Sequence, residues 1–491
     1  MNYEVQFDTA AHYVDVRLRY ISRTAQAPGS DTVRLCMPVW APGYYLILDY
    51  PKNMVDFRAE DSRGHALAWE KSGKSMWKIF PEGADTLFVS YRVFSWERSV
   101  AESRVGSESA FLATNGVFLY PENGKNCPVE VTFVLPDNWK TVSTGLTPVG
   151  TKPGEAATQR RTFAASDFDV LYDSPVLLGN QESVLFRHEG KDYELAMETP
   201  DGWEETPFLD DLKSMMTAAT HLMGDVPYDR YCYILLGAGG GGLEHLNSQA
   251  SYTQGNFRFA NRDEYLRFFS FVTHEYFHLY NVKAIRPIEL GPFDYEREVF
   301  TPMLWVSEGF TVYYETQLLL RAGIADADYL LSDLSSFIRT VESREGHRHM
   351  SLRQSSYDIW LNFFNRNPNG AATRISYYGK GPILGLLMDI EIRRLTHGEK
   401  SLDDVMRLLY YTYFIEKKRG FTEEEFWDAC REVAGQPLRL MRHYVDTTAE
   451  IDYEKCLAPA GLGLDRTTWT LYRLPDPGAE ALKIRKQMLL E

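Results

Sequence analysis

The stretch FVTHEYFHLYNVKAIRP, residues 271–287, carries two histidines four positions apart, with a glutamate directly after the first. On an α-helix, residues four apart lie one turn apart and point the same way. His274 and His278 can therefore bind one metal ion, at the roughly 2.0–2.1 Å that a zinc–nitrogen bond requires. Glu275 lies about 100° further round the helix, close enough to take a proton from a water molecule at the ion. The spacing favours a zinc site with a general base over two histidines buried only for packing.

The helix that carries this motif is predicted to begin at Asn261. The Asn261 side chain can cap the first turn while Glu264 reaches back, which is a capping-box arrangement. An apolar stripe with helical spacing follows, formed by Tyr265, Phe269, Val272, Tyr276 and Leu279. We expect this stripe to face the core, with the two histidines on another side of the helix.

A catalytic zinc site needs a third protein ligand and leaves one position open for water. The longer metzincin pattern requires glycine at position 281 and histidine at position 284, where this chain has Asn281 and Ala284, so that class is excluded. Glu308, in LWVSEGFTVYYE, is favoured because an acid in an apolar setting is costly to bury unless a cation pairs with it. The alternative is a helix N-terminal acid that serves the helix dipole. The downstream acids that could supply this ligand are Glu289, Asp294, Glu296, Glu298, Glu308 and Glu315.

The two ends of the chain differ in their hydrophobic periodicity. Up to about residue 185 apolar residues alternate, as in YVDVRLRYI at 13–21, which predicts half-buried antiparallel strands and an all-β domain. From about residue 205 the spacing becomes helical, as in TPFLDDLKSMMTAATHLMG at 206–224. RYCYILLGAGGGGLEHLNS at 230–248 reads as a strand that runs into glycines, and a mostly helical C-terminal part follows.

Composition excludes several classes of protein. The formal net charge of −16 argues against a nucleic-acid surface, because phosphate binding needs clustered lysine and arginine. No run of about 18 apolar residues occurs, so no membrane span is predicted. The start MNYEVQFDTA lacks the features of a signal peptide, so a cytoplasmic location is expected, and export stays open if the sequence was trimmed. The five cysteines are far apart without a CxxC pair, which indicates neither a disulfide framework nor a thiolate zinc site.

These motifs together resemble the glycyl aminopeptidase family, metallopeptidase family sixty-one of the gluzincins. HEYFHLYNVKAIRP followed by WVSEGFTVYYE resembles its zinc-binding segments, MPVWAPGYYLILDY at 37–50 its N-terminal signature, and FDVLYDSPVLLG at 168–179 its junction segment. The resemblance implies a multidomain α+β protein that binds zinc. The implied parts are an N-terminal all-β domain at 1–185, a thermolysin-like α/β catalytic domain at 186–325, a helical domain at 326–460 and a short appendage at 461–491.

The chain departs from the family pattern at two points. Members commonly carry a C-terminal PDZ domain, and the residues after 460 are too few for one, so no role of such a domain is expected. Ala284 and Leu246 stand where basic residues are expected. A preference for glycine at the substrate N-terminus is therefore not assumed.

The glycine-rich stretch GAGGGGLEHLNS at 237–248 resembles the exopeptidase signature of related aminopeptidases. Glycines allow a peptide backbone to approach and pair with a strand edge. The resemblance implies that Gly241, Gly242 and Leu243 line the substrate and that Glu244 binds its ammonium group. The alternative is a flexible glycine-rich turn, and His245 is expected to support the strand and not to bind metal.

The stretch ISYYGKGPILGLLMDIEI at 375–392 resembles the Tyr-x-Lys-Gly segment of the related family, whose tyrosine donates a hydrogen bond to the oxyanion of the tetrahedral intermediate. The match aligns Tyr378 with this role, and Tyr377 is the competing residue. His347 and His349, in GHRHM, are interpreted as part of a solvated loop and not as metal ligands.

The predicted function is zinc-dependent removal of N-terminal residues from peptides with a free amine, with one Zn²⁺ per chain, no nucleic-acid partner and no membrane span. Two alternatives stay open. One is a zinc endopeptidase in which Glu244 is structural. The other is a non-catalytic peptide-binding protein with a silent zinc site, which the presence of Glu275 disfavours because a binder needs no general base. The preferred residue, the peptide length limit, the oligomeric state and the pathway are not specified by the sequence.

Overall fold

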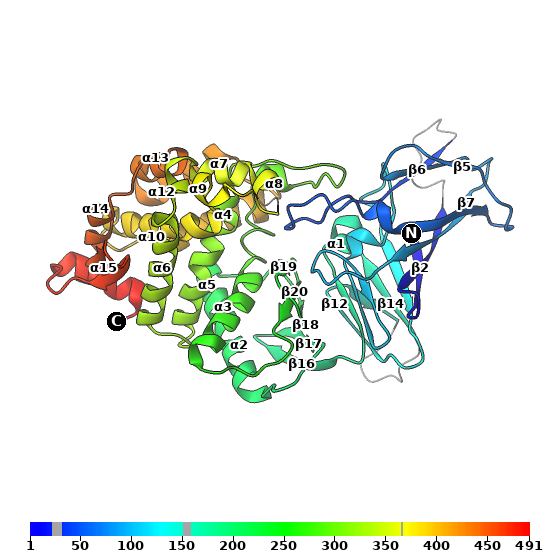
Figure 1. The fold of residues 1–491 in the computed structure, drawn as a ribbon, viewed down its shortest axis with the longest axis horizontal. Coiled ribbons are helices and arrows are strands. Elements are labelled where there is room, and N and C mark those ends of the chain that lie inside the picture. The colour runs from blue at the N-terminus through cyan, green and yellow to red at the C-terminus, as the bar shows by residue number, and fades with distance from the viewer. Residues whose placement is uncertain (22–31, 151–158, 365–366) are drawn as a thin grey trace. The chain divides into compact units, whose positions relative to one another are not determined.

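A computed structural model describes residues 1–21, 32–150, 159–364 and 367–491 of the chain. Contacts divide it into two units (Figure 1). The first unit comprises Met1–Trp203, Tyr228–Arg258 and Phe293–Glu298, and the second comprises Glu204–Pro227, Phe259–Pro292 and Val299–Glu491. Strands dominate up to about residue 200 and helices dominate afterwards, which confirms the predicted α+β class with an N-terminal all-β part. The predicted domain boundaries at residues 185, 325 and 460 stay a prediction.

The largest sheet of the first unit has seven strands in the order β13-β14-β11-β1-β2-β7-β4. In β2, Val14, Val16, Leu18 and Tyr20 are all buried and the residues between them are not, as the alternation predicted. The strands are β1 (Asn2–Asp8), β2 (Tyr13–Ile21), β4 (Met54–Asp61), β7 (Thr86–Phe94), β11 (Val129–Val134), β13 (Thr147–Val149) and β14 (Arg160–Ala165).

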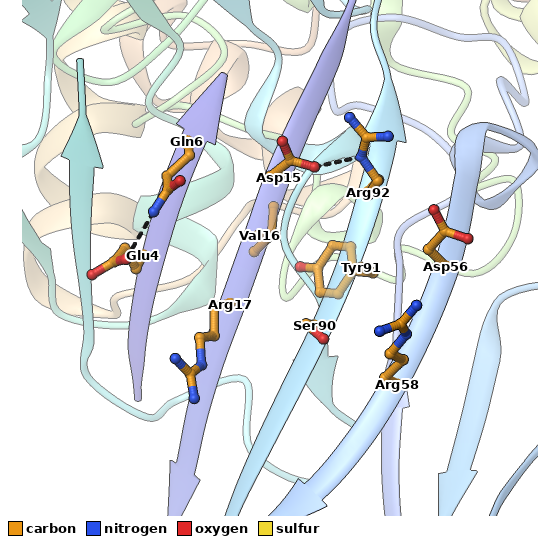
Figure 2. Close-up of a pocket in the computed structure, with 10 residues that line it drawn as sticks. All are labelled: Glu4, Gln6, Asp15, Val16, Arg17, Asp56, Arg58, Ser90, Tyr91 and Arg92. Carbon is orange, nitrogen blue, oxygen red and sulfur yellow. Dashed lines mark hydrogen bonds and ion pairs between the residues drawn. The ribbon is translucent and has the colours of Figure 1, made fainter. Parts of the chain in front are cut away.

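The opposite face of this sheet is polar and carries an open hollow of about 370 Å³ (Figure 2). Arg92 on β7 pairs with Asp15 on β2 at 2.5 Å. Arg17 and Arg58 both lie opposite Ser90 in the strand register. One face of the sheet is therefore solvated and the other covers the core, as is common for antiparallel sheets.

Two four-stranded sheets complete the N-terminal part of the first unit, in the orders β10-β3-β6-β5 and β12-β15-β9-β8. Their apolar residues join those of the large sheet in one buried cluster. The elements are β3 (Val33–Cys36), β5 (Trp69–Lys71), β6 (Met76–Ile79), β8 (Arg104–Val105), β9 (Ser109–Leu112), β10 (Tyr120–Pro121), β12 (Thr141–Thr144), β15 (Val176–Gly179) and the helix α1 (Phe168–Tyr172).

A mixed five-stranded sheet follows within the same unit, in the order β16-β17-β18-β20-β19. Its central strand β18 is the predicted apolar strand, and seven successive residues of it are buried, as a strand covered on both faces requires. Among the described strands, β19 pairs with β20 alone and lies at the edge of the sheet. The strands are β16 (Glu182–His188), β17 (Lys191–Met197), β18 (Arg230–Ala238), β19 (Gly242–Glu244) and β20 (Ser248–Thr253).

The second unit is helical, with α5 packed between α3 and α10 (Figure 1). Its longer helices are α2 (Glu205–Met223), α3 (Arg262–Phe277), α5 (Gly309–Arg321), α6 (Ala327–Glu342), α10 (Tyr377–Leu395), α12 (Glu423–Ala434) and α15 (Ala479–Leu489). The shorter ones are α4 (Leu304–Ser307), α7 (Leu352–Tyr357), α8 (Ile359–Asn362), α9 (Gly370–Thr373), α11 (Leu402–Leu409), α13 (Arg439–Asp446) and α14 (Tyr453–Leu457), and a hairpin of β21 (Leu462–Asp465) and β22 (Thr470–Arg473) precedes α15. None of the helices in the described ranges combines the length and the apolar character needed to cross a bilayer.

Helix α3 begins where the sequence predicts. The side chain of Asn261 accepts a hydrogen bond from the backbone N–H of Glu264 at 2.9 Å. Glu264 also reaches back, but its carboxylate accepts from the N–H of Ala260, one residue before the expected partner. Both interactions fix the start of the helix that carries the two histidines.

Candidate metal centre

Helix α3 directs His274 and His278 at the same point. His274 lies in the last turn, and His278 caps the end of the helix by donating its N–H to the His274 carbonyl at 3.2 Å. The exposed fractions of the two residues are 8% and 2%. The ring centroids are 4.5 Å apart with an angle of 89° between the planes, and the two Nε2 atoms lie 3.0 Å from each other. Two ring nitrogens therefore meet in a buried space.

The partners of the outer nitrogens decide the protonation of the two rings. Nδ1 of His278 lies 2.7 Å from the backbone oxygen of Asn281, which can only accept, so this nitrogen carries the proton. Nδ1 of His274 donates in the same way to Oε2 of Glu315 at 2.7 Å. Each neutral imidazole then turns a lone pair on Nε2 toward the other ring. Two facing lone pairs repel each other unless a cation lies near both. The two Nε2 atoms are therefore suited to bind one metal ion.

Glu308 adds a third acceptor at the same point. It occupies the junction between α4 and α5 and is 2% exposed. Its Oε2 lies 3.2 Å from Nε2 of His278 and 3.6 Å from Nε2 of His274, yet no donor within the described residues forms a well-aligned hydrogen bond to it. Ligand atoms of the three residues all lie within 4.8 Å of one another. Burying a carboxylate oxygen without a hydrogen bond is costly unless a cation pairs with it.

Electrostatics at this point favour positive charge. Burial alone would lower the pKa of His274, but the neighbouring carboxylates of Glu308 and Glu315 outweigh it, so the pKa lies well above its ordinary value. Burial would raise the pKa of Glu308, but the neighbouring His278 and His274 hold it below its ordinary range. The carboxylates thus attract a positive charge to the imidazoles, and a bound metal ion would supply that charge in place of a proton.

A network behind the three acceptors holds them in place. Asn281 is 0% exposed, and its amide donates to the backbone oxygens of Val306 at 2.8 Å and Ser307 at 3.0 Å. The hydroxyl of Thr311 donates to the backbone oxygens of Asn281 and Ser307. The segment after the second histidine is thereby tied to the segment that carries Glu308. Such outer partners orient metal ligands and fix their tautomers.

Helices α5 and α10 cross at two glycines next to the site. A Cβ added at Gly309 would lie 2.5 Å from the Cα of Gly381, and a Cβ added at Gly381 would lie 2.6 Å from the Cα of Gly309. Only glycine allows the two backbones to approach this closely. Gly309 directly follows Glu308, so the crossing sets the distance between the metal ligand and the start of α10.

The start of α10 carries the two tyrosines considered for the oxyanion. Ser376 caps the helix by accepting from the N–H of Tyr378 at 3.2 Å. The ring of Tyr378 is half-buried and lies 6.4 Å from the ring of His274, whereas Tyr377 is only 1% exposed. This difference favours Tyr378 over Tyr377 as the residue that meets a substrate. Lys380 of the same motif is buried as well, and burial lowers its pKa to about 8.

The predicted substrate residues are arranged within the first unit. Gly242, Leu243 and Glu244 form the edge strand β19, and Gly241 precedes it with a left-handed φ of 89°. Glu244 is 4% exposed. A Cβ added at Gly43 would lie 2.7 Å from Oε1 of Glu244, so the backbone of the 37–50 segment packs directly against this carboxylate.

His245 next to this strand has a structural partner. Its Nδ1 lies 3.0 Å from Oδ1 of Asp173, and the N–H of Leu246 donates to Oδ2 of the same aspartate at 2.9 Å. Asp173 belongs to the 168–179 segment. Two segments distant in sequence, 37–50 and 168–179, therefore converge on the end of β19 and hold it.

Comparison with known proteins places these segments in one family. The model of the peptidase M61 N-terminal domain matches residues 2–180, and that of the M61 glycyl aminopeptidase matches residues 267–384. The chain belongs to the M61 glycyl aminopeptidase family. The second match spans the histidine pair, Glu308 and Tyr378, and the first spans both segments that hold β19.

Solved structures share the fold of this M61 chain. An aminopeptidase N family protein from Idiomarina loihiensis is 25% identical, with a TM-score of 0.87 over 94% of this chain and 79% of that one. Yeast LTA4 hydrolase is 12% identical, with a TM-score of 0.53 over 93% and 67%. An M1 zinc metallopeptidase from Deinococcus radiodurans is 13% identical, with a TM-score of 0.54 over 92% and 94%. The last two show the fold alone, and no curated protein matches the chain.

The other residues weighed from the sequence lie elsewhere in the M61 chain. Glu315 binds the outer nitrogen of His274 and is not at the point where the ligand atoms meet. Glu289 accepts from Thr301. His347 Nδ1 lies 2.6 Å from the backbone oxygen of Arg344, and within the described residues neither His347 nor His349 joins a group that could hold a metal.

Sequence reasoning missed the network behind the ligands. Asn281 was considered only because it excludes the metzincin pattern, yet it links the two ligand-bearing segments. The sequence at the start of α5 could have indicated this network. Glu308, Thr311 and Glu315 follow the i, i+3, i+7 spacing of one helix face. Polar residues at this spacing inside an apolar helix indicate that all three face the same buried polar point.

Proposed function

We propose that this protein is a zinc-dependent aminopeptidase that hydrolyses the N-terminal residue from peptides, with one zinc ion per chain. The observation that carries the proposal is the convergence of three buried acceptor atoms, from His274, His278 and Glu308, in a chain of the M61 glycyl aminopeptidase family. These three residues would hold the ion. When bound, zinc supplies a Lewis acid that polarises a carbonyl and makes nearby water more acidic.

Side chains of the protein carry out the proton transfer and stabilise the negative charge of the transition state. Glu275, which is 5% exposed and adjacent to His274 on α3, takes a proton from the attacking water and passes it to the leaving amine. Tyr378 donates a hydrogen bond to the oxygen that becomes negative in the transition state. Glu315 and Asn281 hold the two imidazoles in the tautomer that keeps Nε2 available.

Recognition of the free N-terminus is assigned to the end of strand β19. The edge of β19 offers backbone groups that an extended peptide can pair with, and Gly241 and Gly242 leave room for its approach. Glu244 is a buried carboxylate, and a substrate ammonium group would offset the cost of burying its charge. An aminopeptidase that holds the free amine in this way would release the first residue of the peptide.

The test compares peptides that differ only at the amine. The zinc-loaded protein is assayed on free and N-acetylated forms of the same peptides, with and without a chelator, and products are identified by mass spectrometry. The proposal requires chelator-sensitive release of the first residue from free peptides and poor cleavage of the acetylated ones. Equal rates on both forms would indicate an endopeptidase, and binding without turnover would indicate a silent zinc site.

A further inference from the structure

The second unit exposes a group of large apolar side chains near residues 300 and 357–363, one of which packs against Tyr378, and we call this group the apolar wall. It consists of Phe300, Tyr357, Leu361 and Phe363, whose exposed fractions are 41%, 47%, 61% and 48%. Three of the four lie within residues 357–363, and such a concentration of exposed apolar side chains is typical of a binding surface. None of the four carries a charge, so this surface would recognise a ligand through apolar contact.

The apolar wall is held in a fixed position by buried neighbours. In the short helix α8, Ile359 and Trp360 are only 5% and 8% exposed, so the helix turns Leu361 outward, and Phe363 follows directly after the helix. The indole N–H of Trp360 donates to the backbone oxygen of Val299 at 2.9 Å, which ties α8 to the chain next to Phe300. The rings of Phe300 and Tyr357 lie 5.3 Å apart.

Phe363 connects this surface to the candidate metal centre. Its ring lies 5.8 Å from the ring of Tyr378, which in turn lies 6.4 Å from the ring of His274. An extended peptide advances about 3.3–3.6 Å per residue. Phe363 therefore packs on the tyrosine that would meet the carbonyl of the cleaved bond, within reach of a side chain next to that bond.

We infer that Phe363 and the adjoining apolar wall bind the side chain of a substrate residue at the cleaved bond, so that peptides with a bulky apolar residue there are preferred. The inference rests on the proposed function and adds a substrate class to it. Contact with Phe363 removes apolar surface of both partners from water, which stabilises the complex in proportion to the buried area. A glycine at the same position makes no such contact.

The experiment uses four peptides with free amines, in which leucine or glycine stands on either side of the cleaved bond. The wild-type protein should cleave leucine peptides at least roughly 10-fold more efficiently in kcat/KM at one of the two positions, the discrimination that an apolar pocket commonly provides. Phe363→Ala should remove most of this difference by slowing leucine peptides, with glycine peptides and zinc content nearly unchanged. Phe363→Leu should keep most of it, because an apolar side chain remains.

A matched control separates this effect from general damage. Tyr411→Ala also removes a large, partly exposed aromatic side chain of the second unit, 39% exposed, and should leave the leucine-to-glycine ratio as in the wild type. If Phe363→Ala slows leucine and glycine peptides by the same factor, Phe363 only positions Tyr378 and the inference is wrong. If the wild type cleaves the peptides without preferring leucine, the inference fails while the proposed function stands. If the zinc-loaded wild type cleaves none of them, free or acetylated, the proposed function fails.

Discussion

Replacing Gly381 by alanine should slow turnover far more than it weakens zinc binding. The added Cβ would lie 2.6 Å from the Cα of Gly309 and 3.1 Å from the backbone oxygen of Trp305. Both neighbours are backbone atoms and cannot rotate away. Carbon atoms pack at about 3.5–4.0 Å, so α10 and α5 must separate by roughly 1 Å.

This displacement can be converted into expected changes of rate and stability. α10 carries Tyr378, whereas α5 directly follows Glu308, so the separation moves the oxyanion donor away from the metal ligands. A misplacement of about 1 Å can cost roughly 10²-fold in rate. Overpacking costs about 1–3 kcal/mol, of which the better helix propensity of alanine returns about 1 kcal/mol. The free energy of unfolding should therefore fall by about 2 kcal/mol or less.

The assay measures kcat on a cleaved peptide, zinc content by mass spectrometry and the melting temperature of the same preparations. Gly379→Ala is the matched control, because it lies in the same helix turn and its Cβ would meet only a methyl group of Val341, at 3.4 Å, an ordinary van der Waals distance. This control should keep its turnover and be slightly more stable. If Gly381→Ala keeps zinc and turns over as fast as Gly379→Ala, the close crossing does not set the position of Tyr378.

Three further predictions concern single side chains. Glu308→Ala should lose most of the bound zinc, because it removes one of three converging acceptors, whereas Glu275→Gln should keep the zinc and lose turnover; zinc content and activity are measured on both. Tyr378→Phe should lower kcat by about 10²–10³-fold with little change in KM, since it removes one donor to the developing oxyanion. Burial and the nearby Glu315 raise the pKa of Asp333 from 3.8 to about 7, so the folded protein keeps a proton that the unfolded chain has released. The free energy of unfolding should therefore fall as the pH rises from 3.8 to about 7, and Asp333→Asn should remove this part of the pH dependence in urea denaturation.

Each of these predictions has a contradicting result. Equal zinc content in Glu308→Ala and the wild type would mean that another residue is the third ligand. A nearly unchanged kcat in Tyr378→Phe, with a large loss in Tyr377→Phe, would reverse the choice between the two tyrosines. An unchanged slope of stability against pH in Asp333→Asn would mean that this carboxyl ionises normally in the folded protein.

Local periodicity in the sequence was sufficient to predict the strands and helices that carry the site. Alternation in residues 13–21 identified a half-buried strand, and the spacing of His274 and His278 identified one face of a helix. Asn261 was recognised as the cap because capping depends on atoms within one helical turn. These features depend on neighbours a few residues away, so the sequence contains all the information needed for them.

The tertiary structure decided everything that depends on contacts between distant segments. Glu308 and Glu315 were both candidates for the third ligand, and only the packing of α5 against α3 shows that one faces Nε2 and the other Nδ1 of His274. No periodic pattern in the sequence predicts that Gly309 packs against Gly381. The same is true of the packing of Gly43 against Glu244. Exposure of Phe363 beside Tyr378 is likewise set by how α8 is anchored and not by local spacing. In each case the deciding quantity is a distance between atoms far apart in the chain, which local residue patterns do not encode.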